Sequence, residues 1–291
     1  MKHTSLKPIH WVTDARRDGI RAKGWLRAHK WWLLRRASQM SLLLIFALGP
    51  WMGLWIARGN FASSELFGLV SLSDPLILLQ SALAGHAVAT VALTGAVIVL
   101  VFYGLVGGRV YCSWVCPVNI VTDSAHWLRE KLGITRDRKL NKNTRYVVLA
   151  AALGASVASG TIAWEFINPV SLLQRGVIFG IGFGWTIILA LFLCDLLIAR
   201  RAWCGHICPV GAFYGLLGAK SLVRVDAKNR KDCNNCGACF RACTEPHVIT
   251  PALKGENSVI LSGDCTNCGS CIDVCPTDVF SMTVTLGKRD G

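Results

Sequence analysis

Residues 233–243 read CNNCGACFRAC, and residues 265–275 read CTNCGSCIDVC. Each stretch carries four cysteines with the spacing C-x2-C-x2-C-x3-C. In this spacing three thiolates surround one [4Fe-4S] cluster, and the fourth reaches the neighbouring cluster. The two motifs therefore predict a module that holds two [4Fe-4S] clusters and transfers single electrons.

The fourth cysteine of each motif is expected to be exchanged between the clusters. The first cluster then has the ligands Cys233, Cys236, Cys239 and Cys275, and the second has Cys265, Cys268, Cys271 and Cys243. A pair of zinc knuckles is the alternative, because four thiolates also suit zinc. Cys275 precedes Pro276, as the motif prefers, but Cys243 precedes Thr244, which predicts an altered environment for the second cluster. We expect an α+β ferredoxin-like domain over residues 221–285 and a short tail over 286–291.

The rest of the chain is strongly apolar. Of its 291 residues, 53% are hydrophobic, and the mean hydropathy is positive. Four apolar stretches, residues 37–57, 86–107, 146–164 and 176–199, each approach the roughly 20 residues that a helix needs to cross a bilayer. After a basic segment over residues 1–36, the sequence thus predicts an integral membrane all-α four-helix bundle over residues 37–220.

The basic residues predict how this bundle is oriented. Ten Lys and Arg precede the first stretch, eight lie in residues 108–145 and eleven follow the fourth, whereas the other two loops hold only Arg58 and Arg175. By the positive-inside rule, both termini and the ferredoxin-like domain lie in the cytoplasm of a bacterium, and the protein spans its inner membrane several times. The same rule accounts for the net charge of +14 without nucleic acid as a partner.

A duplicated motif divides the bundle into two helical hairpins. Residues 112–117 read CSWVCP and residues 204–209 read CGHICP, each at the end of an apolar stretch. Upstream of each motif lies an Asp-Pro or Asn-Pro pair, at Asp74 and Asn168. The spacing matches, so the hairpins are internal repeats.

The four cysteines of these motifs are Cys112, Cys116, Cys204 and Cys208. The proline that follows each second cysteine suits the start of a new helix, whose dipole would lower the pKa of that thiol. Three interpretations stay open: a further thiolate-bound metal centre, a set of redox thiols, or cysteines that are simply buried.

Six polar residues are predicted near the outer membrane face, where an ionisable group is costly unless it is used. They are candidates for a quinol site, although each of them also suits a structural role in a loop. The candidates are Asp74, Gln80, His86, Glu165, Asn168 and Gln174.

The order of these motifs resembles that of the NapH-type ferredoxin proteins. The resemblance includes the Trp-rich start, Gly49-Pro50-Trp51, Gly85-His86 and the stretch WCGHICPVG at residues 203–211. It implies the membrane component of a quinol dehydrogenase that passes electrons from the quinol pool towards periplasmic nitrate reductase in anaerobic nitrate respiration. It also implies a periplasmic-side iron–sulfur protein or a tetrahaem cytochrome as partner.

A second hypothesis is a metal reductase or an assembly factor for a periplasmic or membrane metalloenzyme, in which the four CxxxCP thiols carry the metal. A redox sensor is a weaker third hypothesis, since the sequence has no large outward domain. The sequence leaves open whether the chain is itself an enzyme, which quinone it uses and in which direction electrons flow.

Overall fold

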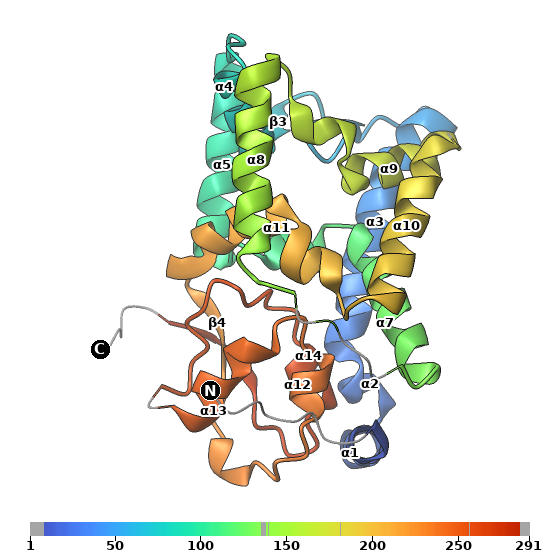
Figure 1. The fold of residues 1–291 in the computed structure, drawn as a ribbon, viewed down its shortest axis with the longest axis vertical. Helices are drawn as coiled ribbons and strands as arrows, with labels where there is room; N and C mark the ends of the chain where they lie inside the picture. Colours follow the sequence, from blue (N-terminus) through green and yellow to red (C-terminus); the bar gives the residue numbers. More distant parts are fainter. Residues whose placement is uncertain (1–8, 135–137, 139, 181, 256, 286–291) are drawn as a thin grey trace.

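The computed structural model describes residues 9–134, 138, 140–180, 182–255 and 257–285. A helical body occupies the upper part of Figure 1, and a smaller body that contains the C-terminal cysteines lies below it. The long helix α3 runs from the lower body to the top of the upper one. The predicted tail at residues 286–291 lies outside the described residues.

In the first half of the chain, the elements run from the lower body to the top of the helical body and then back down towards the lower body. They are α1 (Ile9–Lys23), α2 (Trp25–Ala28), α3 (Lys30–Met52), β1 (Ala57–Gly59), β2 (Ser63–Leu66), β3 (Val70–Ser73), α4 (Pro75–Leu83), α5 (Thr90–Val106), α6 (Val110–Trp114) and α7 (Val118–Lys131).

The second half of the helical body repeats this path without the strands. Its elements are α8 (Thr144–Ser159), the 3-10 helix η1 (Ala163–Phe166), α9 (Pro169–Phe179), α10 (Phe183–Leu197), the π-helical turn η2 (Trp203–Ile207), α11 (Pro209–Leu217) and the 3-10 helix η3 (Gly218–Lys220).

The two sequence repeats form the same local elements. The Asp74 side chain accepts a hydrogen bond from the backbone N–H of Leu76 at 2.9 Å and caps α4. The Asn168 side chain accepts one from Val170 at 3.1 Å and caps α9 in the same way. A proline at the first helical position supports both caps, since its fixed φ suits a helix and it has no N–H to satisfy. Each capped helix leads to an apolar helix and then to a cysteine pair.

The helices differ from the four predicted membrane spans. In the described part of the chain, no helix combines the length and apolarity needed to cross a bilayer. Helices α5, α8 and α10 have 17, 16 and 15 residues, and at about 1.5 Å per residue they fall short of the roughly 30 Å of hydrocarbon. Glycines in the left-handed conformation, Gly160 and Gly180, end α8 and α9, so the predicted stretch 176–199 is split between α9 and α10. The predicted four-span membrane bundle is therefore not supported.

The sequence predicts an all-α upper body, but this body also contains three strands. Strands β1, β2 and β3 form an antiparallel sheet with the order β1-β2-β3, in which Arg58 pairs with Glu65 and Glu65 with Ser71. This sheet packs against α5 at Gly95, where an added Cβ would lie 2.4 Å from the carbonyl oxygen of Ser71. Strands this short and polar carry little hydrophobic periodicity, which is why the sequence did not reveal them.

The lower body is the predicted ferredoxin-like domain. Strands β4 (Val223–Asp226) and β5 (Ser281–Val284) pair antiparallel, and the remaining helices lie between them in the chain. These are the 3-10 helices η4 (Arg230–Asp232) and η5 (Pro246–Val248), with α12 (Ala238–Ala242), α13 (Ile249–Lys254) and α14 (Ser270–Val274). Its apolar core includes Val225, Ile249, Ile260 and Phe280 together with buried cysteines.

Three glycines allow close backbone contacts near the junction of the two bodies: Gly108 packs on α11 within the helical body, and Gly263 of the lower body packs on the same helix. A Cβ added at Gly108 would lie 1.8 Å from the carbonyl oxygen of Tyr214, and one added at Gly263 would lie 2.2 Å from that of Gly215. Gly218 packs between them, against Gly108 and Gly263. Only residues without a side chain fit at such contacts. They fix the position of the loop before Cys265 relative to the CxxxCP motifs.

This packing predicts different effects for two glycine substitutions. Gly108→Ala should lower the free energy of unfolding by at least about 2 kcal/mol, because the added methyl group overlaps the backbone of α11. Gly104→Ala, in α5, should be neutral or stabilising by about 0.5 to 1 kcal/mol, since nothing lies within 4 Å of its added Cβ. Thermal unfolding of the two purified variants compares them, and equal stability would contradict the close approach.

Candidate metal centre

The first set of thiols gathers around helices α12 and α14. Gly237 and Gly269, at φ 81° and 71°, hold the left-handed turns that begin these helices. Burial and the neighbouring Cys236, Cys275 and Cys233 raise the pKa of Cys239 to about 12. The structure thus brings together the four cysteines that were assigned to the first cluster, including the exchanged Cys275.

The second set surrounds a cavity in the same body. Cys243, Cys265, Cys268 and Cys271 all line it, so the exchanged Cys243 lies beside the motif that it was predicted to complete. Burial raises the pKa of Cys271 well above its ordinary value, and the other cysteines of the set add to the effect. Cys268 is the exception: burial opposes ionisation, but the Arg35 charge and a hydrogen bond with Ser270 hold its pKa below the ordinary value.

These donor sets fit [4Fe-4S] clusters. Thiolates are costly in an apolar interior unless a cationic centre compensates for their charge, and both sets border the domain's apolar core. The backbone N–H of Val279 donates to Cys275 Sγ at 3.5 Å, which is the kind of hydrogen bond that stabilises a ligating sulfur. Within the described part of the chain, no group of three or more His, Cys, Asp or Glu side chains is arranged to hold a single metal ion, and this applies to both cysteine sets and to the four CxxxCP thiols.

The departure from the motif after Cys243 has a structural role. Glu245 is 2% exposed, and its Oε1 atom accepts from Arg109 Nη1 at 3.0 Å and from Arg145 Nη1 at 3.3 Å. Its Oε2 atom lies 3.4 Å from Lys142 Nζ. The three basic residues belong to the helical body and the loop before α8. Glu245 therefore anchors the cluster domain to the helices.

Asp264, the residue before Cys265, forms the second anchor. Its Oδ1 atom accepts from Arg145 Nη2 at 2.6 Å, and its Oδ2 atom lies 3.1 Å from His247 Nε2. Partial burial would raise the pKa of Asp264, but the His247 hydrogen bond and the charges of Arg145 and Arg109 hold it well below its ordinary value. We refer to Arg109, Arg145, Glu245 and Asp264 as the central ion network.

The four CxxxCP thiols lie together at the junction of the two bodies. Cys112 and Cys208 act electrostatically on Cys116, and Asp195 acts on Cys204 together with the other three cysteines. Backbone N–H groups at the start of α7 hydrogen-bond to Cys116, and those at the start of α11 hydrogen-bond to Cys208. The predicted low pKa is wrong, however, because burial outweighs these bonds and raises the pKa of Cys208 to about 12.

Arg109 connects these thiols to the second set. Its Nη2 atom donates to the backbone carbonyl of Cys204 at 2.8 Å, while its Nη1 atom donates to that of Asp264 at 3.2 Å. Ser113, between Cys112 and Cys116, donates to the carbonyl oxygen of Thr266 at 2.7 Å. Two residues of the first CxxxCP segment thus hold the loop that carries Cys265 and Cys268.

The six candidates for a quinol site have structural partners or lie apart. Gln80 Oε1 accepts from Ser156 Oγ at 3.1 Å and from the N–H of Trp164 at 3.2 Å. Gln174 Oε1 accepts from the N–H of Phe61 at 3.1 Å.

The other candidates give the same picture. Besides its cap, Asn168 donates to Glu165 Oε2 at 3.0 Å, and Asp74 caps α4 as described above. His86 is exposed in the loop before α5. None of the six lines the cavity that the structure shows between the helical body and the cluster domain.

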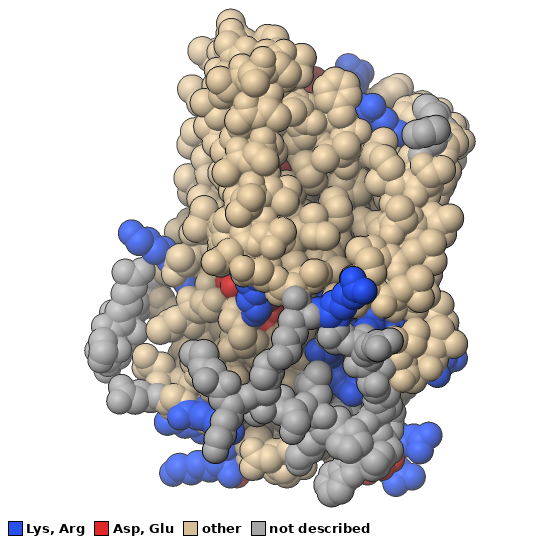
Figure 2. Space-filling model, in the orientation of Figure 1, with Lys and Arg blue, Asp and Glu red and all other residues tan. Residues whose placement is uncertain are grey.

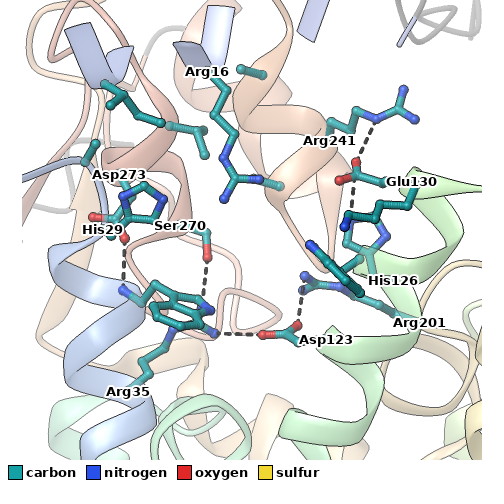
Figure 3. Close-up of a pocket in the computed structure, with 18 residues that line it drawn as sticks. Arg16, His29, Arg35, Asp123, His126, Glu130, Arg201, Arg241, Ser270 and Asp273 are labelled. Carbon is teal, nitrogen blue, oxygen red and sulfur yellow. Dashed lines mark hydrogen bonds and ion pairs between the residues drawn. The ribbon is translucent and has the colours of Figure 1, made fainter. Parts of the chain in front are cut away.

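That cavity has a volume of about 370 Å³ and lies where α1, α3 and α7 meet α12 and α14 (Figure 3). Asp123 of α7 pairs there with Arg201 Nη2 at 2.9 Å and with Arg36, and Arg241 Nε pairs with Glu130 Oε1 at 2.9 Å. The sequence did not indicate this cavity, because its walls come from five separate segments.

Comparison with known proteins agrees with this geometry. A family model described as a 4Fe-4S binding domain matches residues 88–135 and 178–226, which contain the two CxxxCP motifs. A second model, described as a 4Fe-4S dicluster domain, matches residues 225–276. Both cysteine systems therefore lie in segments related to iron–sulfur proteins.

Curated relatives cover nearly the whole chain. The methylamine utilization ferredoxin-type protein MauN of Methylorubrum extorquens is 66% identical over 94% of this chain and 96% of its own length. The ferredoxin-type protein NapH of Escherichia coli is 51% identical over 93% of this chain and 95% of its own. The chain belongs to the NapH-type ferredoxin proteins. MauN of Paracoccus denitrificans is 63% identical over 96% of this chain and 99% of its own, and no solved structure matches.

The exchanged cysteines allow a direct test in this NapH-type protein. Cys243→Ser should remove the cluster of the second set and leave the first, and Cys275→Ser should do the reverse, so each variant should lose about half of its iron. Cys194→Ser, which changes a cysteine of α10 that belongs to neither set, is the control and should keep its full iron content. Iron analysis and EPR of the reduced proteins measure this. The exchange would be refuted if Cys243→Ser lost the cluster of Cys233, Cys236 and Cys239, or if Cys275→Ser lost the cluster of Cys265, Cys268 and Cys271.

Proposed function

We propose that the protein transfers electrons from quinol through two [4Fe-4S] clusters, as the quinol dehydrogenase component of a respiratory chain. Oxidation of one quinol releases two electrons and two protons, and two clusters of this type take up one electron each. The observation that carries the proposal is the pair of thiol sets in one small body, packed against cationic side chains of the helical body.

Those cations address an energetic difficulty. Ferredoxin-type clusters often have potentials too low to be reduced by quinol. Arg201, which is buried, acts electrostatically on Cys268 and Cys243, and Arg35 acts on Cys268. A fixed positive charge stabilises the reduced and more negative state of a nearby cluster, so both arginines raise the potential of the second set.

We also propose that the protein sits at the bacterial cytoplasmic membrane, with the cluster domain and both termini on the cytoplasmic side. Most Lys and Arg side chains in Figure 2 gather around the lower body, and the face of the upper body is largely uncharged. Large apolar side chains of α5 and α10 are about half exposed, among them Phe102, Ile98, Leu189 and Leu193. An apolar surface this extensive supports contact with lipid.

The pathway that the protein serves is a separate part of the proposal. The resemblance to NapH favours delivery towards periplasmic nitrate reductase, with a periplasmic-side iron–sulfur protein or a tetrahaem cytochrome as partner. The higher identity to two MauN proteins favours a role in methylamine utilization instead. We place methylamine utilization first, because two MauN sequences are 66% and 63% identical to this chain, whereas the Escherichia coli NapH sequence is 51% identical.

The second candidate function is metal reduction or assembly for another metalloenzyme. It is supported by the half-buried group of Cys112, Cys116, Cys204 and Cys208, which lies beside the second thiol set. Thiols with raised pKa values bind soft metals only when the metal displaces the proton. In this case the group would hold a metal in transit.

Quinol oxidation predicts that the purified protein, kept anaerobic and with both clusters, is reduced by a menaquinol analogue within seconds. Cluster EPR and visible bleaching follow the reaction. The double variant Cys112→Ser, Cys116→Ser separates the two candidates. It should slow electron transfer but leave the metal content of the terminal enzyme normal, whereas a loss of that metal would favour assembly. Clusters that respond to dithionite but not to quinol would refute the proposal.

Deletion of the gene from its host should distinguish the two pathways. If methylamine utilization is correct, growth on methylamine should stop while anaerobic growth on nitrate continues, and the wild-type gene should restore it. The Cys243→Ser variant should not restore it, and Cys194→Ser should. Loss of nitrate growth alone would assign the protein to nitrate respiration.

A further inference from the structure

A cavity lies between the cluster domain and helices α1, α3 and α7. No residue of the central ion network lines it. Its volume of about 370 Å³ lies in the range of about 300 to 1,000 Å³ typical of small-molecule sites. Figure 3 shows Arg16 of α1 reaching into it, with Arg35 and Asp123 on the opposite wall. In the described part of the chain no residue pairs with Arg16.

Several buried polar atoms in the wall lack partners. In the described residues, Arg35 Nε, Arg201 Nε and His126 Nδ1 have no hydrogen-bond partner. All three residues are at least nine-tenths buried, and these three atoms have almost no accessible surface. Unpaired buried polar atoms are uncommon in folded proteins and cost free energy. Arg16, by contrast, is exposed and lines the cavity, so its guanidinium is the donor that a ligand with oxygen acceptors can reach.

The wall also offers acceptors and flat apolar surface. The carboxylates of Asp123 and Glu130 face the cavity, and the indole rings of Trp32 and Trp127 line it. Burial and the positive charge of Arg201 lower the pKa of His126 to about 3, so its ring is neutral at pH 7 and takes part in hydrogen bonds without being protonated. A planar ring whose oxygens alternate between hydroxyl and carbonyl forms suits this mixture of donors, acceptors and aromatic walls.

The cavity lies directly against both thiol sets. Ala238 and Ala242 flank Cys239 on α12, and Ser270 and Val274 flank Cys271 on α14; all four line the cavity. Ser270 Oγ lies 3.4 Å from Cys268 Sγ and accepts from Arg35 Nη2 at 3.2 Å. A ring bound here is separated from the thiols of both sets by a single layer of side chains.

We propose that this cavity binds the ring of a quinone, with one oxygen facing Arg16 and the other facing Arg35 on the opposite wall. The assignment rests on the proposed quinol oxidation. It differs from the predicted site at Asp74, Gln80, His86, Glu165, Asn168 and Gln174, none of which lines this cavity.

Photolabelling tests the site without relying on catalysis. The full-length protein with both clusters is incubated anaerobically with an azido-naphthoquinone and irradiated, and the labelled peptides are identified by mass spectrometry. Label should appear in the peptides of α1 to α3 and of α7, and excess menadione should remove it. Label confined to the α4–α5 or α9 segments would overturn the assignment.

Two variants and a matched control sharpen the test. Arg16→Gln should weaken labelling about tenfold, as expected for the loss of one hydrogen bond from a charged donor. Ile20→Trp, which fills the cavity from the same helix, should abolish it. Arg17→Gln changes the adjacent exposed arginine, which does not line the cavity, and should label like the wild type. Equal labelling of all three variants would overturn the proposal, as would displacement of the label by pyrophosphate but not by menadione.

The same samples separate this inference from the proposed function. Labelling in the cavity without cluster reduction by quinol would support the site and refute quinol oxidation. Reduction by quinol that survives in Ile20→Trp, with label elsewhere, would support the function and refute this site. Retained iron content shows that the variants fold, and Arg16→Gln is expected to fold because Arg16 makes no ion pair in the described residues.

Discussion

The buried ion pair of Arg109 and Glu245 joins the two bodies of the molecule. Arg109 lies at the start of α6 in the helical body, and Glu245 lies two residues after the cluster ligand Cys243. Arg109 is 0% exposed and Glu245 is 2% exposed. Removing one partner of such a pair leaves an uncompensated buried charge and typically costs about 3 to 5 kcal/mol. Arg145 and Asp264 extend the pairing, so the cluster domain has one defined position on the helices.

Other features of the molecule depend on that position. The backbone contact of Gly263 with Gly215 requires the same docking, and so does the hydrogen bond from Ser113 to Thr266. With the domain docked, the CxxxCP thiols lie beside the second thiol set on one side, and the cavity lies against α12 and α14 on the other. The second thiol set therefore lies next to the CxxxCP thiols, and both sets lie next to the cavity. This arrangement is expected of a protein that passes electrons from one site to the next.

The sequence was informative where chemistry imposes a fixed spacing. The double C-x2-C-x2-C-x3-C motif predicted the ferredoxin-like domain, and the duplicated CxxxCP motif corresponds to two similar sets of elements.

The sequence was less informative where the outcome depends on tertiary contacts. The apolar stretch 176–199 looked like one helix, but the left-handed turn at Gly180 divides it. Glu245 was noted only as a departure from the motif, because its partners lie more than ninety residues away in sequence. The pKa prediction for Cys116 and Cys208 considered the helix dipole but not burial, which is the larger effect here.

The central claim is that buried arginines at the junction tune the second thiol set for reduction by quinol. An EPR-monitored redox titration of the wild-type protein tests it most directly. The account predicts two resolved midpoint potentials, with the cluster of Cys243, Cys265, Cys268 and Cys271 at the higher value and within reach of menaquinol; the Cys243→Ser variant identifies which signal belongs to it. Two low and equal potentials, both far below that of the quinone pool, would contradict the account.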